Sequence, residues 1–350
     1  AYKARLYKHR DPEGSLNGHP VSHPGRWSAG VITDFALDFI HRHQDTSFFA
    51  YCAYLSPHAP LDAPDSLVAV YTAEGLSPKL ATVYAMIDQV DTEIGRLLLG
   101  LQNLGLAEET IVLFLSDNGP AVLNADLTEE DRALRYHSGL RGHKGNLWEN
   151  GVKSPLFVRW PGQLRPGSVE SLADVTDLMP TLLDLAGITL PEGYLPLDGR
   201  SLRPLLEGLP RTGKSSFDYV HPAWPPTERP WTPEGVLDEY RPISPAERLQ
   251  MTYTDQILSA RNDRYKLMLN VATYANTPPL IRNRVLIDMQ TDPKETRNVI
   301  EAHPAVTERL EADLKGWFHA IQAESHAFGS PVYLIREPET ELPAKGAFQL

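Results

Sequence analysis

The feature that most restricts the fold of this chain is an alternation of helical and strand patterns. Apolar residues recur at helical spacing from Val83 to Leu104, and the run Thr110 to Leu115 then has the composition of a buried strand. Pro155 to Trp160 reads as a further strand, and Asp177 to Ile188 again has helical spacing. This order predicts an α/β fold with a mainly parallel sheet flanked by helices.

An earlier helix and strand extend the pattern toward the N-terminus. Thr33 to His43 carries apolar residues on one helical face, and Thr33 is a plausible N-cap. Phe48 to Leu55 is a short apolar run typical of a buried parallel strand, and the prolines around His58 end it. Ligands of such sheets bind beyond the carboxyl ends of the strands, so we expect His58, Asp117 and Asn118 at the functional edge.

The C-terminal part has a different pattern. Leu209 to Pro245 is rich in proline and tryptophan, and we interpret it as a functional rim. Ile257 to Val271 and Val285 to Met289 predict antiparallel strands, and Pro304 to Phe318 predicts an amphipathic helix. We therefore expect an α/β catalytic domain over residues 1–255, a small α+β subdomain over residues 256–330 and a tail over residues 331–350.

Charge and composition exclude several classes of protein. The net charge of −12 gives no electrostatic support to nucleic-acid binding. No apolar run approaches the length of a membrane span, and a single cysteine, Cys52, excludes an internal disulfide. Cys52 lies in an apolar run, where a free cysteine is usually a small core residue rather than a nucleophile.

Four side chains are candidates for chemistry. Asp117 and Asn118 offer the oxygen ligands that Ca²⁺ and Mg²⁺ prefer, although Ser-Asp-Asn-Gly is also good turn sequence. Lys144, between Gly142 and Gly145, can hold a sulfate or phosphate oxygen, although most lysines are simply solvated. His58 can bind an ester oxygen or protonate a leaving group, or it packs in a rigid turn.

In their order and spacing, these segments resemble the formylglycine-dependent sulfatases, the arylsulfatase-like family of the alkaline phosphatase superfamily. The segment Gly142 to Gly151 is similar to that family's Gly-x-Lys-Gly-x-x-aromatic-Glu-Gly-Gly motif, with Asn150 in place of one glycine. Asparagine tolerates left-handed backbone, so we expect the turn to survive. The segments around Pro57-His58-Ala59-Pro60, Asp177 to Gly187 and Asp288 to Asn298 are also similar to the family's.

The resemblance implies a role for each candidate residue. Asp117 and Asn118 would be ligands of a divalent cation, usually Ca²⁺ with Mg²⁺ as the alternative, while Lys144 and His58 would contact the sulfate and its ester oxygen. The nucleophile of the family is a formylglycine made from the cysteine of Cys-x-Pro-Ser-Arg. No such motif occurs here, because Cys52 is followed by Ala53-Tyr54-Leu55. We therefore expect that the chain lacks its N-terminal portion, that formylglycine belongs to that portion, and that this chain alone has little activity.

The expected function is hydrolysis of carbohydrate or aryl sulfate monoesters. Two alternatives stay open: a phosphodiesterase or phosphonate monoester hydrolase of the same superfamily, and a non-catalytic remnant that binds an anion or a partner. The expected ligand is a small-molecule or saccharide sulfate ester. The resemblance favours a periplasmic or secreted location, with the cytoplasm as the alternative, and the sequence leaves the oligomeric state open.

Overall fold

A computed structural model of the 350-residue chain describes residues 2–4, 8–121, 127–211, 213, 215–220, 250, 252–273 and 281–327. The chain divides into two compact units. Unit 1 comprises residues 1–115, 122–137 and 155–167, and unit 2 comprises residues 116–121, 138–154 and 168–350. Within the described ranges, no helix combines the length and the apolar character that a membrane crossing requires. The functional domain boundary expected after residue 255 stays a prediction.

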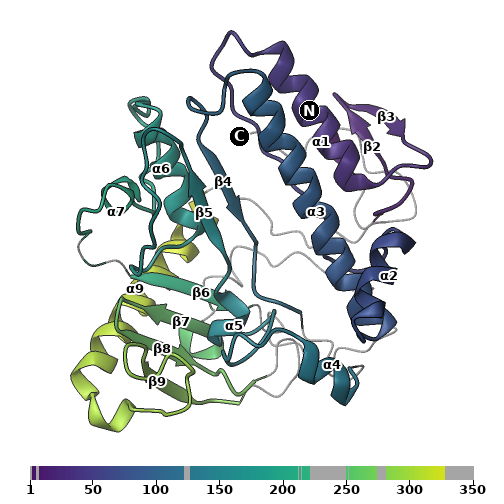
Figure 1. Ribbon diagram of the computed structural model, residues 1–350. Helices are drawn as coiled ribbons and strands as arrows, with labels where there is room; N and C mark the ends of the chain where they lie inside the picture. The colour runs from purple at the N-terminus through teal and green to yellow at the C-terminus, as the bar shows by residue number, and fades with distance from the viewer. Residues whose placement is uncertain are drawn as a thin grey trace. The chain divides into compact units, whose positions relative to one another are not determined.

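Unit 1 combines helices with two small antiparallel sheets (Figure 1). Its helices are α1 (Ser28–Arg42), α2 (Asp65–Ala73), α3 (Pro78–Asn103) and α4 (Glu129–Leu134). Its strands are β1 (Tyr2–Ala4), β2 (Glu13–Leu16), β3 (His19–Ser22), β4 (Val112–Leu115) and β5 (Leu156–Arg159).

The longest helix of unit 1 is α3, and the other long helices pack against it. Ser77 caps its N-terminus by accepting a hydrogen bond from the Leu80 amide, and Pro78 occupies the first turn, where a missing N–H costs nothing. α1 and α2 both pack against α3, and Figure 1 shows α1 lying beside it. Ala81, Ala85 and Met86 on α3 are fully buried. The helical pattern from Val83 to Leu104 therefore predicted this helix correctly, although the helix begins five residues earlier.

Two local predictions in unit 1 are wrong. Thr33 is not an N-cap, because α1 begins at Ser28; its hydroxyl instead donates to the Ala29 carbonyl at 3.0 Å inside the helix. Residues 48–55 form no strand, and Phe49 and Tyr51 are 73% and 81% exposed. A strand needs a hydrogen-bonded neighbour, and none of the described strands pairs with this segment.

The strand β4 is present as predicted, and it pairs with β5. Val112 lies opposite Arg159 and Phe114 opposite Phe157 in an antiparallel register. Every strand pair among the described residues is antiparallel, so the parallel neighbours expected for β4 are not seen there. The reason is that a short apolar run has the same composition in both kinds of sheet, so periodicity predicts the strand but not its partner.

Unit 2 contains an antiparallel sheet in the order β6-β7-β8-β9, with α9 packed on it (Figure 1). The strands are β6 (Ser216–Val220), β7 (Ile257–Arg261), β8 (Tyr265–Leu269) and β9 (Arg284–Asp288). The helices are α5 (Glu149–Val152), α6 (Leu178–Leu185), α7 (Arg203–Leu206) and α9 (Pro304–Ala327). Short 3₁₀ turns occupy η2 (Val175–Asp177), η3 (Tyr253–Asp255) and η4 (Ile300–Ala302).

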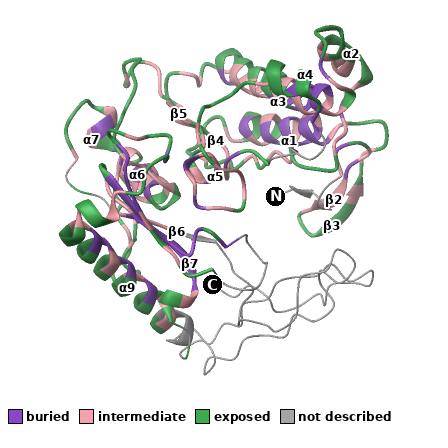
Figure 2. Ribbon diagram, turned by 90° about the horizontal axis from the view of Figure 1, so that it is seen from below, coloured by how far each residue is buried: buried purple, intermediate pink, exposed green. Residues whose placement is uncertain are grey.

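The core of unit 2 lies between α9 and the sheet. Leu310, Leu314 and Phe318 of α9 pack with Leu258 and Leu267 of the strands. Figure 2 shows buried residues along both α9 and β7. The antiparallel strands and the amphipathic helix predicted for this region are thus confirmed. Most of the predicted rim, residues 209–245, and the whole tail, residues 331–350, lie outside the described residues.

Candidate functional site

The loop that follows β4 carries the two predicted metal ligands. Asp117 is exposed and Asn118 is half-buried. Asn118 Nδ2 donates to the Gly119 carbonyl at 3.0 Å, and the Ser116 hydroxyl donates to the Asn118 carbonyl at 3.2 Å. Among the described residues, no hydrogen bond or ion pair engages the Asp117 carboxylate. The loop therefore presents one carboxylate and one amide oxygen, a donor set that suits a hard divalent cation.

Gly119 brings this loop against the loop that carries Lys144, residues 141–149, which we call the Lys144 loop. The Gly119 amide donates to the Gly151 carbonyl at 2.9 Å, and the Lys144 amide donates to the Pro120 carbonyl at 2.9 Å. A Cβ atom on Gly119 would lie 1.8 Å from the carbonyl oxygen of Asn150, so only glycine permits this approach. The structure thus brings Asp117 and Asn118 together with the Lys144 loop.

The glycines on either side of Lys144 have left-handed backbone. Gly142 and Gly145 have φ angles of 89° and 88°, the left-handed region that glycine adopts freely. Lys144 is half-buried, and within the described part of the chain its ammonium group makes no hydrogen bond or ion pair. A cation in that state is available to an anionic ligand.

Asn150 keeps the turn intact by a route that the sequence did not predict. It lies in α5 and is absent from the residues with positive φ, so the left-handed backbone expected for it is wrong. Its side chain instead ties the loop together. Asn150 Nδ2 donates to the Gly142 carbonyl at 3.0 Å, and Asn150 Oδ1 accepts from the Ser138 hydroxyl at 2.9 Å. The amide side chain thus fixes the start of the Lys144 loop.

His58, the fourth predicted residue, belongs to unit 1, whereas the other three belong to unit 2. Its ring is exposed, and its main-chain carbonyl accepts a hydrogen bond from His9 Nε2 at 2.8 Å. Burial lowers the pKa of His9, so the neutral form of its ring is favoured. In the neutral ring, Nε2 donates to His58 and Nδ1 can accept a hydrogen bond from the Ser56 hydroxyl at 3.3 Å. His9 therefore holds the turn that carries His58. Sequence reasoning missed His9, because it lies 49 positions from His58 and no local pattern marks the contact.

Cys52 is half-buried in unit 1, and burial raises the pKa of its thiol. A thiol with a raised pKa forms little thiolate at neutral pH and is a poor nucleophile. The described residues also contain no cluster of three or more His, Cys, Asp or Glu side chains that could hold a metal ion. The predicted ligands Asp117 and Asn118 are thus not part of such a cluster among the described residues.

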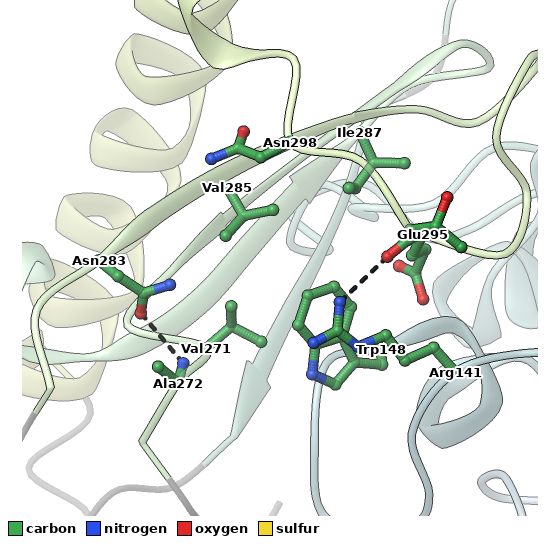
Figure 3. A pocket seen from close by; sticks show the side chains of 10 residues that line it. Arg141, Trp148, Val271, Ala272, Asn283, Val285, Ile287, Glu295 and Asn298 are labelled. Atoms are coloured by element: carbon green, nitrogen blue, oxygen red, sulfur yellow. Dashed lines mark hydrogen bonds between the residues drawn. The ribbon is translucent and has the colours of Figure 1, made fainter.

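A hollow of about 440 Å³ lies beside the Lys144 loop within unit 2 (Figure 3). The Arg141 guanidinium lies 3.5 Å from the centre of the Trp148 ring, and Arg141 Nη1 donates to the Glu295 carbonyl at 3.1 Å. On the opposite wall, Asn283 Oδ1 accepts from the Ala272 amide at 3.0 Å. The Arg141–Glu295 hydrogen bond links the Lys144 loop to the segment after β9.

Comparison with known proteins identifies the family of this chain. The sulfatase family model matches residues 2–188, which is more than half of the chain. The chain belongs to the sulfatase family. A second model, that of the C-terminal part of N-sulphoglucosamine sulphohydrolase, matches residues 142–241.

Relatives of this sulfatase include proteins from bacteria and animals. It is 28% identical over 310 residues to the uncharacterized sulfatase YdeN of Escherichia coli K12, covering 83% of this chain and 50% of YdeN. It is 34% identical over 189 residues to human arylsulfatase A, covering 53% of this chain and 33% of that protein. The chain thus spans half or less of the length of these relatives.

The fold agrees with this relationship. The crystal structure of Ps i-CgsB in complex with k-i-k-neocarrahexaose matches with a TM-score of 0.66 and 20% identity, covering 90% of this chain and 62% of that one. The predicted α/β class of the sulfatases is therefore confirmed.

Proposed function

We propose that the protein is a sulfuric ester hydrolase that acts on sulfate monoesters. The observation that carries the proposal is the pairing of two loops in unit 2. The Gly119–Gly151 and Lys144–Pro120 hydrogen bonds join a loop with metal-type oxygen ligands to a loop whose Lys144 ammonium group pairs with no described residue. Membership of the sulfatase family supports the same activity.

Asp117 and Asn118 would hold the divalent cation, with Ca²⁺ the expected ion and Mg²⁺ the alternative. When bound, such a cation polarises an oxygen of the sulfate group. Ca²⁺ takes about six to eight oxygen ligands, so two side chains supply only part of its shell. The formylglycine nucleophile of the family would come from a Cys-x-Pro-Ser-Arg motif, which these 350 residues do not contain.

Lys144 and His58 would act on the substrate itself. The Lys144 ammonium group is a compact positive charge on a loop whose glycines let a ligand approach the backbone. It would hold a sulfate oxygen and stabilise the charge that grows there in the transition state. His58, with an exposed ring in a turn held by His9, would bind the ester oxygen and protonate the departing alcohol.

The proposed substrates are small-molecule or saccharide sulfates. The aryl alternative is supported by human arylsulfatase A among the relatives, and the saccharide alternative by the neocarrahexaose bound to Ps i-CgsB. An exported location, periplasmic or secreted, is proposed on the basis of the family.

The test is turnover of a chromogenic aryl sulfate by the protein produced from its complete reading frame. We expect Lys144→Ala and Asp117→Asn each to lower kcat by about 100-fold or more, since a removed transition-state contact costs on this order. Lys153→Ala is the matched control, because Lys153 is an exposed lysine at the end of α5 and should leave kcat unchanged. Equal activity of all variants would overturn these assignments, and absent turnover in the unaltered protein would favour an anion-binding remnant.

A further inference from the structure

Four charged side chains lie together next to the Lys144 loop, three of them buried and Arg261 half-buried. Lys266, the second residue of β8, is fully buried, and its ammonium group donates to Glu295 Oε1 at 2.9 Å and to Glu149 Oε2 at 3.3 Å. Arg261, from the end of β7, donates to Glu149 Oε1 and Oε2 at 2.6 and 2.8 Å. We call Glu149, Arg261, Lys266 and Glu295 the buried ion cluster.

Both carboxylates of the cluster are paired with cations of the cluster. Burying a charge is costly unless it is paired, and here each carboxylate faces Lys266. Burial acts to raise the pKa of Glu149, but the charges of Lys266 and Arg261 outweigh it, and the net effect is a lowered pKa. Burial raises the pKa of Glu295 despite the same lysine. Glu149 is therefore the carboxylate that the two cations hold ionised.

Glu295 connects the cluster to the loop backbone. Its Oε2 accepts a hydrogen bond from the Glu149 amide at 2.6 Å, at the first residue of α5. Glu295 itself has a φ angle of 56°, left-handed backbone that costs energy in a residue other than glycine. The turn after β9 thus adopts an unfavourable conformation that places a buried carboxylate at the end of the Lys144 loop.

The loop is anchored on both sides of Lys144, and the Lys144 amide is held by the Pro120 carbonyl. On the C-terminal side, Glu149 joins the cluster. On the N-terminal side, Arg141 donates to the Glu295 carbonyl at 3.1 Å and lies over Trp148. Between these anchors, the Lys144 side chain has no hydrogen bond or ion pair to any described residue.

We propose that Lys266 is a positioning residue for Lys144. Through Glu149 and Glu295 it fixes the ends of the 141–149 segment against the sheet, so that the Lys144 ammonium group is held where an anion binds. Lys266 does not touch the substrate. This inference rests on the proposed function for the identity of the anion, whereas the anchoring of the loop can be measured without turnover.

The first experiment is amide hydrogen exchange on the full chain, comparing the unaltered protein with Lys266→Met and Glu149→Gln. We expect exchange in residues 142–148 to accelerate at least about tenfold in both variants, while α9 and β8 keep their protection. Lys153→Met is the matched control and should change neither. Glu149→Gln keeps the size of the side chain. If Lys266→Met does not fold, exchange in residues 142–148 of Glu149→Gln tests the proposal.

Uniform acceleration across unit 2 would overturn the proposal, since it would make the cluster a general stabiliser. Unchanged exchange in residues 142–148 would overturn it as well. A second readout is the affinity for inorganic sulfate, measured by calorimetry, which should fall about tenfold in Lys266→Met. If the unaltered protein binds no sulfate while the loop still loosens selectively, the proposed function fails and the positioning role stands.

Discussion

At the scale of single residues, Gly119 has little freedom to change. Its missing side chain allows the loop that carries Asp117 and Asn118 to lie against the Asn150 carbonyl, where a Cβ would sit at 1.8 Å. We expect Gly119→Ala to lower the free energy of unfolding by about 1–3 kcal/mol, because backbone must move to relieve the overlap. Urea denaturation measures this change.

Gly95→Ala is the control for that substitution. Gly95 is exposed within α3, and a Cβ there would meet no atom within 4 Å. Alanine should therefore stabilise the helix by about 1 kcal/mol through its higher helix propensity. Destabilisation of the same size in both variants would show that the crowding at Gly119 has no special effect.

The roles of some single residues could be predicted from the sequence, and the roles of others could not. The sequence pointed to Lys144, because glycines on both sides let a ligand approach the backbone closely. It did not predict the role of Asn150, whose side chain bonds to residues 8 and 12 positions away. The buried ion cluster was also missed, since Lys266 and Glu149 are 117 positions apart and nothing local marks such a pair.

At the scale of elements, the packing of α9 on the β6–β9 sheet can be tested by truncating one of its buried side chains. Leu314 is fully buried between α9 and the strands, whereas Ile321 on the same helix is 39% exposed. We expect Leu314→Ala to lower the free energy of unfolding by about 2–5 kcal/mol and Ile321→Ala to change it far less. Similar losses for both would contradict the packing described for α9.

The end of β9 supplies a prediction about pH. Asp288 Oδ2 accepts from Arg264 Nη2 at 2.9 Å, and hydrogen bonding to that guanidinium lowers the pKa of Asp288 below its usual 3.8. The ionised carboxylate therefore stabilises the fold at pH values above its pKa in the unfolded chain. This stability is lost as the pH falls through the lowered pKa of the folded protein. Urea unfolding at about pH 5 and about pH 3 should show a smaller pH dependence in Asp288→Asn than in the unaltered protein. An identical dependence in both would contradict the pairing.

Elements were predictable where a periodic pattern was long or repeated. The 26-residue helix α3 and the strands β7 to β9 carry such patterns, and they were found. Residues 48–55 have strand composition but no strand partner among the described residues, because pairing depends on neighbours that a local pattern does not contain.

At the scale of the whole molecule, the order of motifs along the chain carried more information than any one motif. Ser-Asp-Asn-Gly alone is an ordinary turn, and a lysine between glycines is commonplace. Their order predicted the family that the sulfatase model then matched over residues 2–188. The division into two compact units was not predicted, since each unit is assembled from segments that are discontinuous in sequence.

The most direct measurement for the central claim is a comparison of kcat/KM for a sulfate monoester and for phosphate diesters, made on the protein from its complete reading frame. We predict that the sulfate monoester is preferred and that Lys144→Ala removes most of that activity. Preference for the phosphate diester would contradict the claim and would make the protein a phosphodiesterase or phosphonate monoester hydrolase.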